Sequence, residues 1–494
     1  MKNDHLLSFE VDKRTIGKSA VSSIVFQLLT KLKGLITMPI LTMFMAPAEL
    51  GAFNLITVTS SMLIPIVTLN LTDGVGILFA QEKDVTRIAN MFNTVLNVVV
   101  LLTACFFLAA AVLGALFTQY DGYLVWIGLL LLGNIAHKLP VFLLATYQKS
   151  GIVLGNVFKK DMAVTLFTIL LVCYGYSYRG MVIAAFVFQM LFSLLLYRKI
   201  FSSIDYSFRI DRRLLKQFLR MSLPLLPVFF FSWIVQSSDS YFLAYFSGKE
   251  VVGKYSVIYG ISNIILSITF ALNFFWFPVS ARLWTESREK YTEVFRVIFT
   301  GMAALLLTAV CLFELNSATI MELFIRRAAY HDAHVIMGTI AFAFSMQVLI
   351  TLLTAPLYSN RNTRAILMAY CAGGILNTVL NVLLIPKMGI VGAAVSTAVA
   401  YLLIVMVMAV LNYRLAGFFF VDPRLKYVVV LLLACWGLLG WARGHLSTPG
   451  ILCTDVAFVA LVSAAACKKG MHSGERDYLA GLVTNFSMKQ TQGA

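Results

Sequence analysis

The chain has 494 residues, of which 60% are hydrophobic and only 13% are charged, and its mean hydropathy is +0.85. Ordinary soluble domains carry about 25% charged residues, so this composition excludes a water-soluble globular protein. The net charge of +16 could suggest a nucleic-acid partner, but the distribution of the basic residues indicates a membrane topology and no nucleic acid.

Long apolar runs follow one another along most of the chain. About 20 apolar residues span a bilayer as a helix, whereas barrel strands are shorter and alternate apolar with polar positions. We therefore predict an all-α polytopic membrane protein with about 14 transmembrane helices. The predicted spans are about 18–45, 51–79, 89–117, 123–147, 157–178, 180–200, 217–246, 252–280, 296–318, 334–358, 365–386, 389–413, 425–444 and 450–467.

A weak internal repeat predicts two pseudo-symmetric six-helix lobes plus a C-terminal helix pair, a plan typical of transporters. The repeat consists of Phe44, Gly51 and Phe53, which match Phe246, Gly253 and Tyr255 at a constant offset of 202 residues. We predict a cytoplasmic N-terminus (1–17), an N-lobe (18–200), a cytoplasmic inter-lobe linker (201–216), a C-lobe (217–413), an extra helix pair (425–467) and a cytoplasmic tail (468–494).

The basic residues lie mainly on one side of this topology. With a cytoplasmic N-terminus, most of the 39 Lys and Arg residues, including Lys159 and Lys160, are assigned to inner segments. The outer loops hold only Arg179, Lys249, Lys254, Arg326, Arg327, Lys387 and Arg443. This bias predicts that both termini are cytoplasmic and that the basic excess faces an anionic leaflet.

Cysteine and histidine give no chemical signal. The seven cysteines are scattered through apolar runs without a Cys-x-x-Cys pair, so we predict neither a metal site nor a disulfide framework. No cofactor is expected. Residues 1–17 are polar and charged, so no secretory signal peptide is predicted.

Three bases fall at membrane depth in the first lobe: Lys31 and Lys33 in span one, and Lys138 in span four. A charge at that depth is costly unless it faces water or a partner. Lys31 and Lys138 are the stronger candidates for a cavity, although snorkelling or structural pairing would also explain them. Pro39 should bend the first helix.

Two acids mark further candidate positions. Asp73 lies in the polar segment 70–74, which either lines the cavity or simply ends span two. Asp239 stands well inside the apolar run 217–246, which Pro224 opens. An acid at this depth indicates a coupling site for a proton or sodium ion, or alternatively a structural hydrogen-bond anchor.

Span eleven carries Asn377 and Asn381, which are four residues apart and so share one helical face. The small residues after Pro386 permit close approach of helices. The pattern predicts a polar stripe and a tight hairpin without naming a ligand.

Several of these segments resemble a known family. Residues 384–394, with Asn377 and Asn381 upstream, are similar to the C-lobe signature of polysaccharide-transport flippases of the multidrug/oligosaccharidyl-lipid/polysaccharide (MOP) superfamily. Further similar segments are 238–243 with the Gly-x-Tyr at 253–255, Thr30-Lys31 with 49–53, and Asp73-Gly74. The resemblance covers about 17–415. Ser240, where the family often has Arg, and the extra base Lys33 depart from it.

The resemblance implies a flippase that moves a lipid-linked oligosaccharide, such as an undecaprenyl-pyrophosphate repeat unit for O-antigen, capsule or exopolysaccharide. Such a flippase works from the inner to the outer leaflet of the bacterial cytoplasmic (inner) membrane. Lys31, Lys33 and Lys138 would then bind the pyrophosphate, and Asn377 and Asn381 the sugar. Asp239, Asp73, Pro39 and Pro224 would serve coupling or gating, driven by a proton or sodium gradient.

The resemblance implies a monomeric transport unit, with polysaccharide polymerase and chain-length machinery as partners. A lipid II flippase or a multidrug exporter of the same superfamily remains an alternative. The short outer loops argue against an enzyme such as a glycosyltransferase or sugar polymerase.

Overall fold

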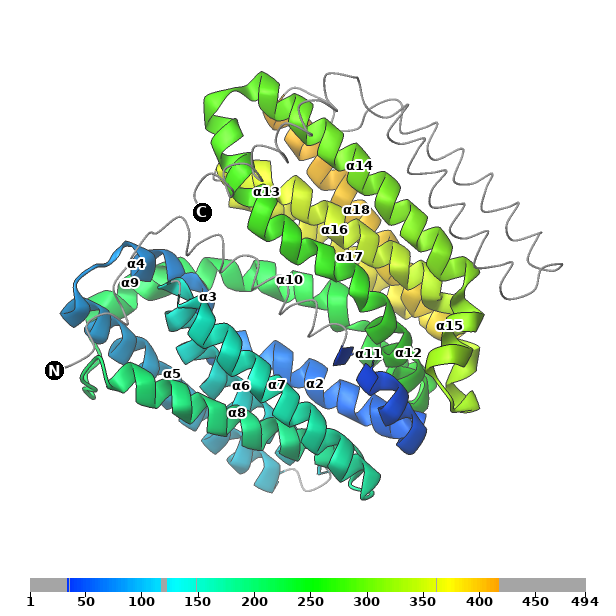
Figure 1. Ribbon diagram of the computed structural model, residues 1–494, viewed down its shortest axis with the longest axis horizontal. Helices are drawn as coiled ribbons and strands as arrows, with labels where there is room; N and C mark the ends of the chain where they lie inside the picture. Colours follow the sequence, from blue (N-terminus) through cyan, green and yellow to red (C-terminus); the bar gives the residue numbers. More distant parts are fainter. Residues whose placement is uncertain (1–32, 35, 117–121, 148, 361, 417–494) are drawn as a thin grey trace, which may run out of the picture. The chain divides into compact units, whose positions relative to one another are not determined.

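The computed structural model describes residues 33–416 except 35, 117–121, 148 and 361. All regular elements in this part of the chain are helices, in agreement with the predicted all-α fold (Figure 1). Ten of them are long and apolar enough to cross a membrane. They correspond to the predicted spans between 51 and 413 apart from 157–178. Since spans 425–444 and 450–467 and most of 18–45 lie outside the described residues, the count of fourteen stays a prediction.

The chain forms two compact units, and each is built from three separate segments of the sequence. The first contains residues up to 261 together with 324–331 and 378–393. The second contains 262–323, 332–377 and the residues from 394 onward. Each unit is described by itself below, and the division into two six-helix lobes stays a prediction.

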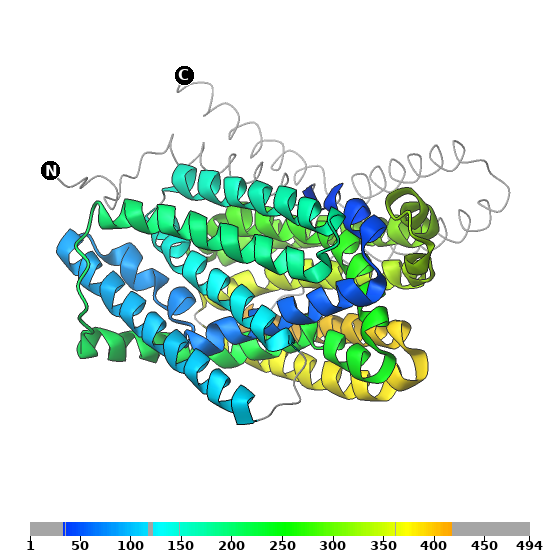
Figure 2. The ribbon, with the colours of Figure 1, turned by 90° about the horizontal axis from the view of Figure 1, so that it is seen from below.

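The described part of the first unit begins in a helix, with 33–34 and 36–44 helical. Its longer helices are α2 (Pro47–Val67), α5 (Val85–Leu116), α6 (Tyr123–Thr146), α7 (Ser150–Cys173) and α8 (Ser177–Phe201). The last three pack against one another and lie side by side (Figure 2, cyan to green). A tight turn joins α7 to α8, with Gly175 at φ 87° and Ser177 at φ 50°. Glycine takes such positive φ values without strain, which explains why Gly175 stands in this turn.

Span two ends earlier than its apolar run suggests. The backbone becomes left-handed at Leu69 and Asn70, and two short helices follow, α3 (Leu71–Gly74) and α4 (Gly76–Gln81). Gly74 packs so closely that a Cβ there would overlap Ser222, at the end of α9 (Arg212–Ser222). The polar segment 70–74 therefore ends α2 and turns the chain back into the unit.

The chain then continues through the short 3₁₀ helix η2 (Leu223–Leu225) into α10 (Leu226–Ser237), α11 (Asp239–Ser247) and α12 (Lys249–Ser262). Two hydrogen bonds connect this segment to α2. The hydroxyls of Thr59 and Tyr241 form a hydrogen bond at 2.6 Å. The indole N–H of Trp233 donates to Ser61 Oγ at 3.3 Å. Both tie the predicted opening helices of the two lobes within one compact unit.

The two glycines of the internal repeat meet each other directly. A Cβ on Gly51 would overlap the carbonyl oxygen of Lys249, and a Cβ on Gly253 would overlap the carbonyl oxygen of Pro47. Residues 47 and 249 are themselves 202 positions apart, so the contact is reciprocal. Small residues allow helix backbones to approach closely in a membrane, where packing rather than hydrophobicity drives association. The glycines of the repeat are therefore explained by one shared contact between the starts of α2 and α12.

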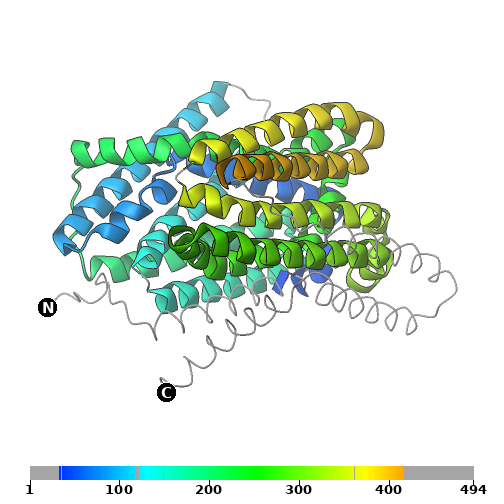
Figure 3. The same cartoon turned by 90° about the horizontal axis from the view of Figure 1, so that it is seen from above.

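The second unit contains η3 (Asn263–Leu266), α13 (Ser267–Glu286), α14 (Arg288–Leu315), most of α15 (Ser317–Phe324) and α16 (Met337–Ser359). Three further elements have residues in both units: the 3₁₀ helix η4 (Ala328–Ile336), α17 (Thr363–Met388) and α18 (Ile390–Ala416). Helix α16 packs against α13 and α14 and is largely buried, and Figure 3 shows α14 and α16 running side by side. Gly338 brings α16 against Glu314 of α14. Small residues thus set helix spacing in this unit as well.

The reciprocal glycine contact predicts that Gly51→Ala and Gly253→Ala each destabilise the protein by about 1–3 kcal/mol through overpacking. The double variant should cost less than the sum, because either new methyl group already separates the same two backbones. Thermal unfolding in detergent, followed by size-exclusion chromatography, measures this. Gly155→Ala on α7 is the control, because its Cβ would meet no atom. Strictly additive losses would contradict a shared contact.

Candidate functional site: a buried carboxylate at a helix break

The predicted span 217–246 is not one continuous helix. It is divided by η2 and again at Ser238, where α10 ends and α11 begins. Pro224 lies in η2, and Pro227 occupies the first turn of α10, where a missing N–H breaks no helical hydrogen bond. Discontinuous helices at membrane depth are tolerated where the freed polar groups find partners. This break places Asp239 at the first position of α11.

Asp239 is buried, with 1% of its surface exposed, and both carboxylate oxygens accept hydrogen bonds. The Tyr255 hydroxyl on α12 donates to Oδ2 at 2.8 Å. The Asn381 amide on α17 donates to Oδ1 at 2.8 Å. All three residues belong to the first compact unit. The carboxylate therefore joins three helices that are far apart in the sequence.

The surroundings of Asp239 suit a negative charge. A carboxylate in the first turn of a helix is stabilised by the helix dipole. Ser238 and Ser240 on either side are also buried. Tyr259 donates its hydroxyl to the carbonyl oxygen of Gln236 at 2.8 Å, just before the break. Tyr255 and Asn381 are neutral donors, so they hold the carboxylate in place without cancelling its charge.

The two asparagines of the predicted polar stripe are both fully buried on α17. Asn381 reaches Asp239, whereas Asn377 falls in the second compact unit. Asn381 is thus a partner of the acid, which the spacing of the asparagines alone did not reveal. That either asparagine binds a sugar stays a prediction.

The predicted bases lie partly in the described residues. Lys31 lies outside them, whereas Lys33 is half-buried within the first unit. Lys138 is half-buried on α6, next to His137, which is 7% exposed. The ring Nδ1 of His137 lies 3.3 Å from the Ser193 hydroxyl on α8. Two of the three predicted bases, Lys33 and Lys138, are therefore partly buried.

A further base lies in the same unit. Lys160 is part of α7 and forms an ion pair with Asp161 at 3.2 Å, and its assignment to the inner side stays a prediction. Both side chains are largely covered, with 14% and 20% exposed. Lys33 interacts electrostatically with both Lys160 and Asp161. His137 interacts electrostatically with Lys160. We call Lys33, His137, Lys160 and Asp161 the charged cluster of the first unit.

The sequence analysis also missed an amide network beside this cluster. Gln189 on α8 donates to Asn134 Oδ1 at 2.8 Å, and Asn134 donates to Ser60 on α2 at 3.5 Å. A signal was present, because Asn134, His137 and Lys138 recur at helical spacing on α6. Sugar hydroxyls and phosphates are the ligands that such amides and bases can bind.

The remaining predicted gating residues have simple positions. Asp73 lies in α3, and Pro39 lies within the helix over 36–44. Their roles, like that of Pro224, stay predictions. Among the described residues no group of three His, Cys, Asp or Glu side chains could hold a metal ion.

Comparison with known proteins decides the family. Residues 16–284, more than half of the chain, match the model of a family described as polysaccharide biosynthesis protein. The chain belongs to this family. This match agrees with the resemblance of its motifs to proteins of polysaccharide transport. The search of curated proteins found no match.

Solved structures show the same fold at low sequence identity. "Lipid II flippase MurJ, inward closed conformation" is similar with a TM-score of 0.70 and 13% identity, covering 90% of this chain and 97% of that one. A MATE protein in complex with MaD3S has a TM-score of 0.56 and 14% identity, covering 84% and 98%. An outward-facing multidrug resistance MATE transporter of the MOP superfamily has a TM-score of 0.54 and 14% identity, again covering 84% and 98%. The names of these neighbours describe a flippase and a multidrug transporter; that this chain is not an enzyme stays a prediction.

The hydrogen bonds at Asp239 predict a specific energetic coupling. Tyr255→Phe should lower stability by about 1.5–3 kcal/mol, the range for a bond to a charged group. The same substitution should cost almost nothing in an Asp239→Leu background, because the acceptor is gone. Unfolding in mixed micelles measures both. Tyr245→Phe on α11, whose side chain is largely exposed, is the control and should change little. Equal losses in the two backgrounds would refute the coupling.

Proposed function

We propose that this protein is a flippase that moves a lipid-linked oligosaccharide from the inner to the outer leaflet of the bacterial cytoplasmic membrane. Membership of the polysaccharide biosynthesis family is the observation that carries the proposal, together with a fold similar to a lipid II flippase. The cargo is an undecaprenyl-pyrophosphate repeat unit destined for O-antigen, capsule or exopolysaccharide. Both termini are cytoplasmic in this proposal, as the distribution of basic residues predicts.

The charged cluster of the first unit supports an anionic cargo. Lys33 and Lys160 supply ammonium groups that can pair with a pyrophosphate as point charges. Lys31 is two residues from Lys33 in the sequence, and Lys138 follows His137. Asn134 and Gln189 offer amides for sugar hydroxyls. The lipid tail stays in the bilayer while the headgroup crosses, so the protein needs to shield only the polar part from the hydrocarbon.

Asp239 supports cation-coupled alternating access. A proton or sodium ion that binds its carboxylate would weaken the hydrogen bonds from Tyr255 and Asn381, because these donors are held more strongly by a charged acceptor. Since the two donors belong to different helices, cation binding would loosen α11 against α12 and α17. A gradient would thereby bias the helix arrangement, as population shift requires. The transport unit is a monomer that hands its cargo to polymerase and chain-length machinery.

A lipid II flippase is the second candidate, because the similarity to such a protein covers nearly the whole of both chains. One assay separates the candidates. The purified protein is reconstituted with fluorescent lipid-linked oligosaccharide or lipid II, and exposure to an external sugar-binding probe is followed with and without a pH or sodium gradient. Gradient-dependent exposure of the oligosaccharide supports the proposal. Exposure of lipid II alone would replace it, and efflux of a small cationic dye alone would indicate a drug exporter.

Asp239→Asn should abolish the stimulation by the gradient, because the amide cannot take up a proton or balance a sodium ion. The residual, gradient-independent rate should fall less than the stimulated one. The assay above measures both rates. Asp84→Asn, which changes an exposed loop carboxyl, should keep full stimulation. An Asp239→Asn variant with wild-type stimulation would show that the carboxylate is only a structural anchor.

Lys31→Ala should abolish export with normal protein levels, and Lys33→Gln should reduce transport at least tenfold, because each removes a cation at membrane depth. Surface polysaccharide in cells and transport in liposomes measure the two effects. Lys159→Gln, an exposed base on α7 beside Lys160, is the matched control with the same charge change. Full export by the Lys31 variant would exclude it as a pyrophosphate ligand.

A further inference from the structure

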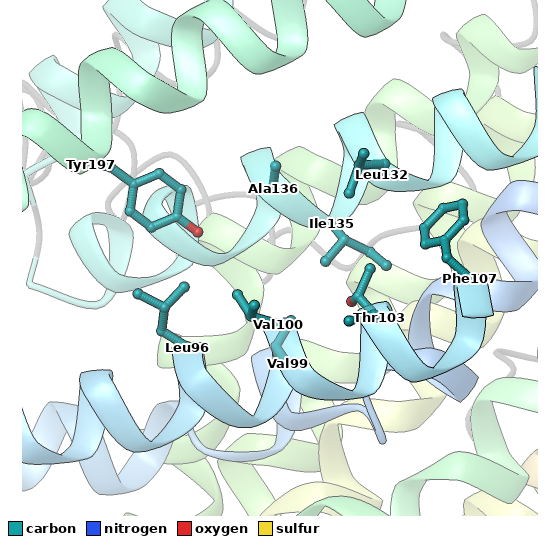
Figure 4. Close-up of a pocket in the computed structure, with 10 residues that line it drawn as sticks. Leu96, Val99, Val100, Thr103, Phe107, Leu132, Ile135, Ala136 and Tyr197 are labelled. Carbon is teal, nitrogen blue, oxygen red and sulfur yellow. The ribbon is translucent and has the colours of Figure 1, made fainter. Parts of the chain in front are cut away.

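The first unit contains a cavity that the proposed transport mechanism does not use. It measures about 350 Å³ and lies between α5, α6 and α8. Its wall is almost entirely apolar, and Figure 4 shows the side chains that line it. A volume above 300 Å³ with an apolar lining and few polar groups is typical of a ligand site. None of the charged-cluster residues lines it, so this is a separate site.

The cavity opens toward an exposed apolar face of α5. Val100, which lines it, is 55% exposed, and its neighbour Leu101 is 52% exposed. Because α5 is long and apolar enough to cross a membrane, these exposed side chains are suited to contact with lipid. An occupant can therefore enter sideways from the bilayer, without passing through water.

The dimensions of the cavity match one leaflet. It extends along α5 from Leu96 to Phe107, a separation of about 16 Å at the rise of an α-helix. The hydrocarbon core of a bilayer is about 30 Å thick, so the cavity covers roughly half of that depth. An acyl chain of a lipid in a single leaflet has the length and chemistry to fill it.

Two side-chain hydroxyls are the polar groups of the cavity wall, and they lie at different positions along it. Tyr197 lies at the Leu96 end and turns its hydroxyl toward the space (Figure 4). Thr103 lies farther along, is 6% exposed, and its hydroxyl has no hydrogen-bond partner in the part of the chain that the structure describes. Lipid esters and hydroxyls lie near the membrane surface, so the Tyr197 end is the one that suits them.

The same end is bordered by an interfacial, basic segment. Arg198 and Lys199 end α8 and are exposed. The extended chain that follows is fixed to α5, because Asn97 donates to the carbonyl oxygens of Ser207 at 2.9 Å and Arg209 at 3.2 Å. Phe208 in this segment is 75% exposed. Exposed aromatic and basic side chains together mark the headgroup level of a membrane.

The net charge of residues 198–213 favours a lipid with an anionic headgroup. Residues 198–213 contain Arg198, Lys199, Arg209, Arg212 and Arg213 against Asp205 and Asp211. Asp211 is engaged as the cap of α9, accepting from the backbone N–H of Arg213 at 2.7 Å. The stretch is therefore net basic, and basic residues at this level attract anionic lipids by about 1 kcal/mol each.

We infer that the α5–α6–α8 cavity is a binding site for an anionic phospholipid of the cytoplasmic leaflet. Its acyl chain lies along α5 between Leu96 and Phe107, and its ester region meets Tyr197. Its phosphate lies over Arg198, Lys199 and Arg209. The bound lipid fills space that would otherwise separate α5 from α6 and α8, and so stabilises the packing of the first unit.

The test uses the full chain, purified and exchanged into detergent that contains phosphatidylglycerol or phosphatidylcholine with the same acyl chains. Native mass spectrometry counts the lipids retained. We expect one tightly retained phosphatidylglycerol, bound at least tenfold more strongly than phosphatidylcholine. No retained lipid, or equal retention of both headgroups, would overturn the inference.

Two matched pairs locate the lipid. Ala104→Phe fills the cavity, because Ala104 lines it, whereas Ala109→Phe adds the same ring at another exposed alanine on α5. Only the first should lose retention, by at least tenfold, while both remain monodisperse.

The double variant Arg198→Gln/Lys199→Gln should still retain the lipid. Its preference for phosphatidylglycerol over phosphatidylcholine should fall about fivefold for each base removed. Lys83→Gln/Arg364→Gln, with the same charge change at exposed sites, should keep the preference. Equal losses within either pair would place the lipid elsewhere.

Discussion

Asp239 accepts one hydrogen bond on each carboxylate oxygen, from Tyr255 and from Asn381. In a low-dielectric interior an unpaired polar group is costly and a paired one is held firmly. This one side chain therefore connects three helices, and removing it takes away the acceptor of both bonds. The helix break at Ser238 is part of the same arrangement, because it brings the carboxylate to the positive end of α11.

Close helix packing provides the second constraint. Gly51 and Gly253 bring the starts of α2 and α12 into backbone contact, and the Asp239 interaction lies farther along the same segment of the first unit. Membrane helices gain little from hydrophobic burial against one another, so close contact and buried polar bonds have to supply the association energy. The glycine contact connects positions that the internal repeat relates, whereas the bonds at Asp239 connect three helices of the second half of the sequence.

The polar and apolar sites of the first unit are lined by different residues, although they share helices. The charged cluster and the amide network involve α2, α6, α7 and α8, whereas the apolar cavity lies between α5, α6 and α8. A headgroup carrier needs both, because the polar part of the cargo must be shielded while the protein itself remains matched to lipid. A resident phospholipid against α5 and a transported headgroup near α7 would then occupy different places and need not compete.

The sequence by itself determined the membrane class, the helical fold, most of the spans and the family. These follow from the length and composition of the apolar runs and from short motifs such as 384–394, which do not depend on long-range contacts. Asp239 also stood out from sequence, because an acid at membrane depth needs a reason. The polar segment at 70–74, by contrast, could equally have lined a cavity, and only the left-handed backbone at Leu69 and Asn70 shows that it ends a helix.

The tertiary structure decided which residues act together. Sequence spacing paired Asn381 with Asn377, but Asn381 bonds to Asp239 on a helix 142 positions away. Lys160 was counted among the inner charges, and only the structure shows that its side chain pairs with Asp161 and is largely covered. Apolar runs record only how much of a segment is hydrophobic. Which face meets which neighbour is set by packing between distant helices, and no local pattern encodes that.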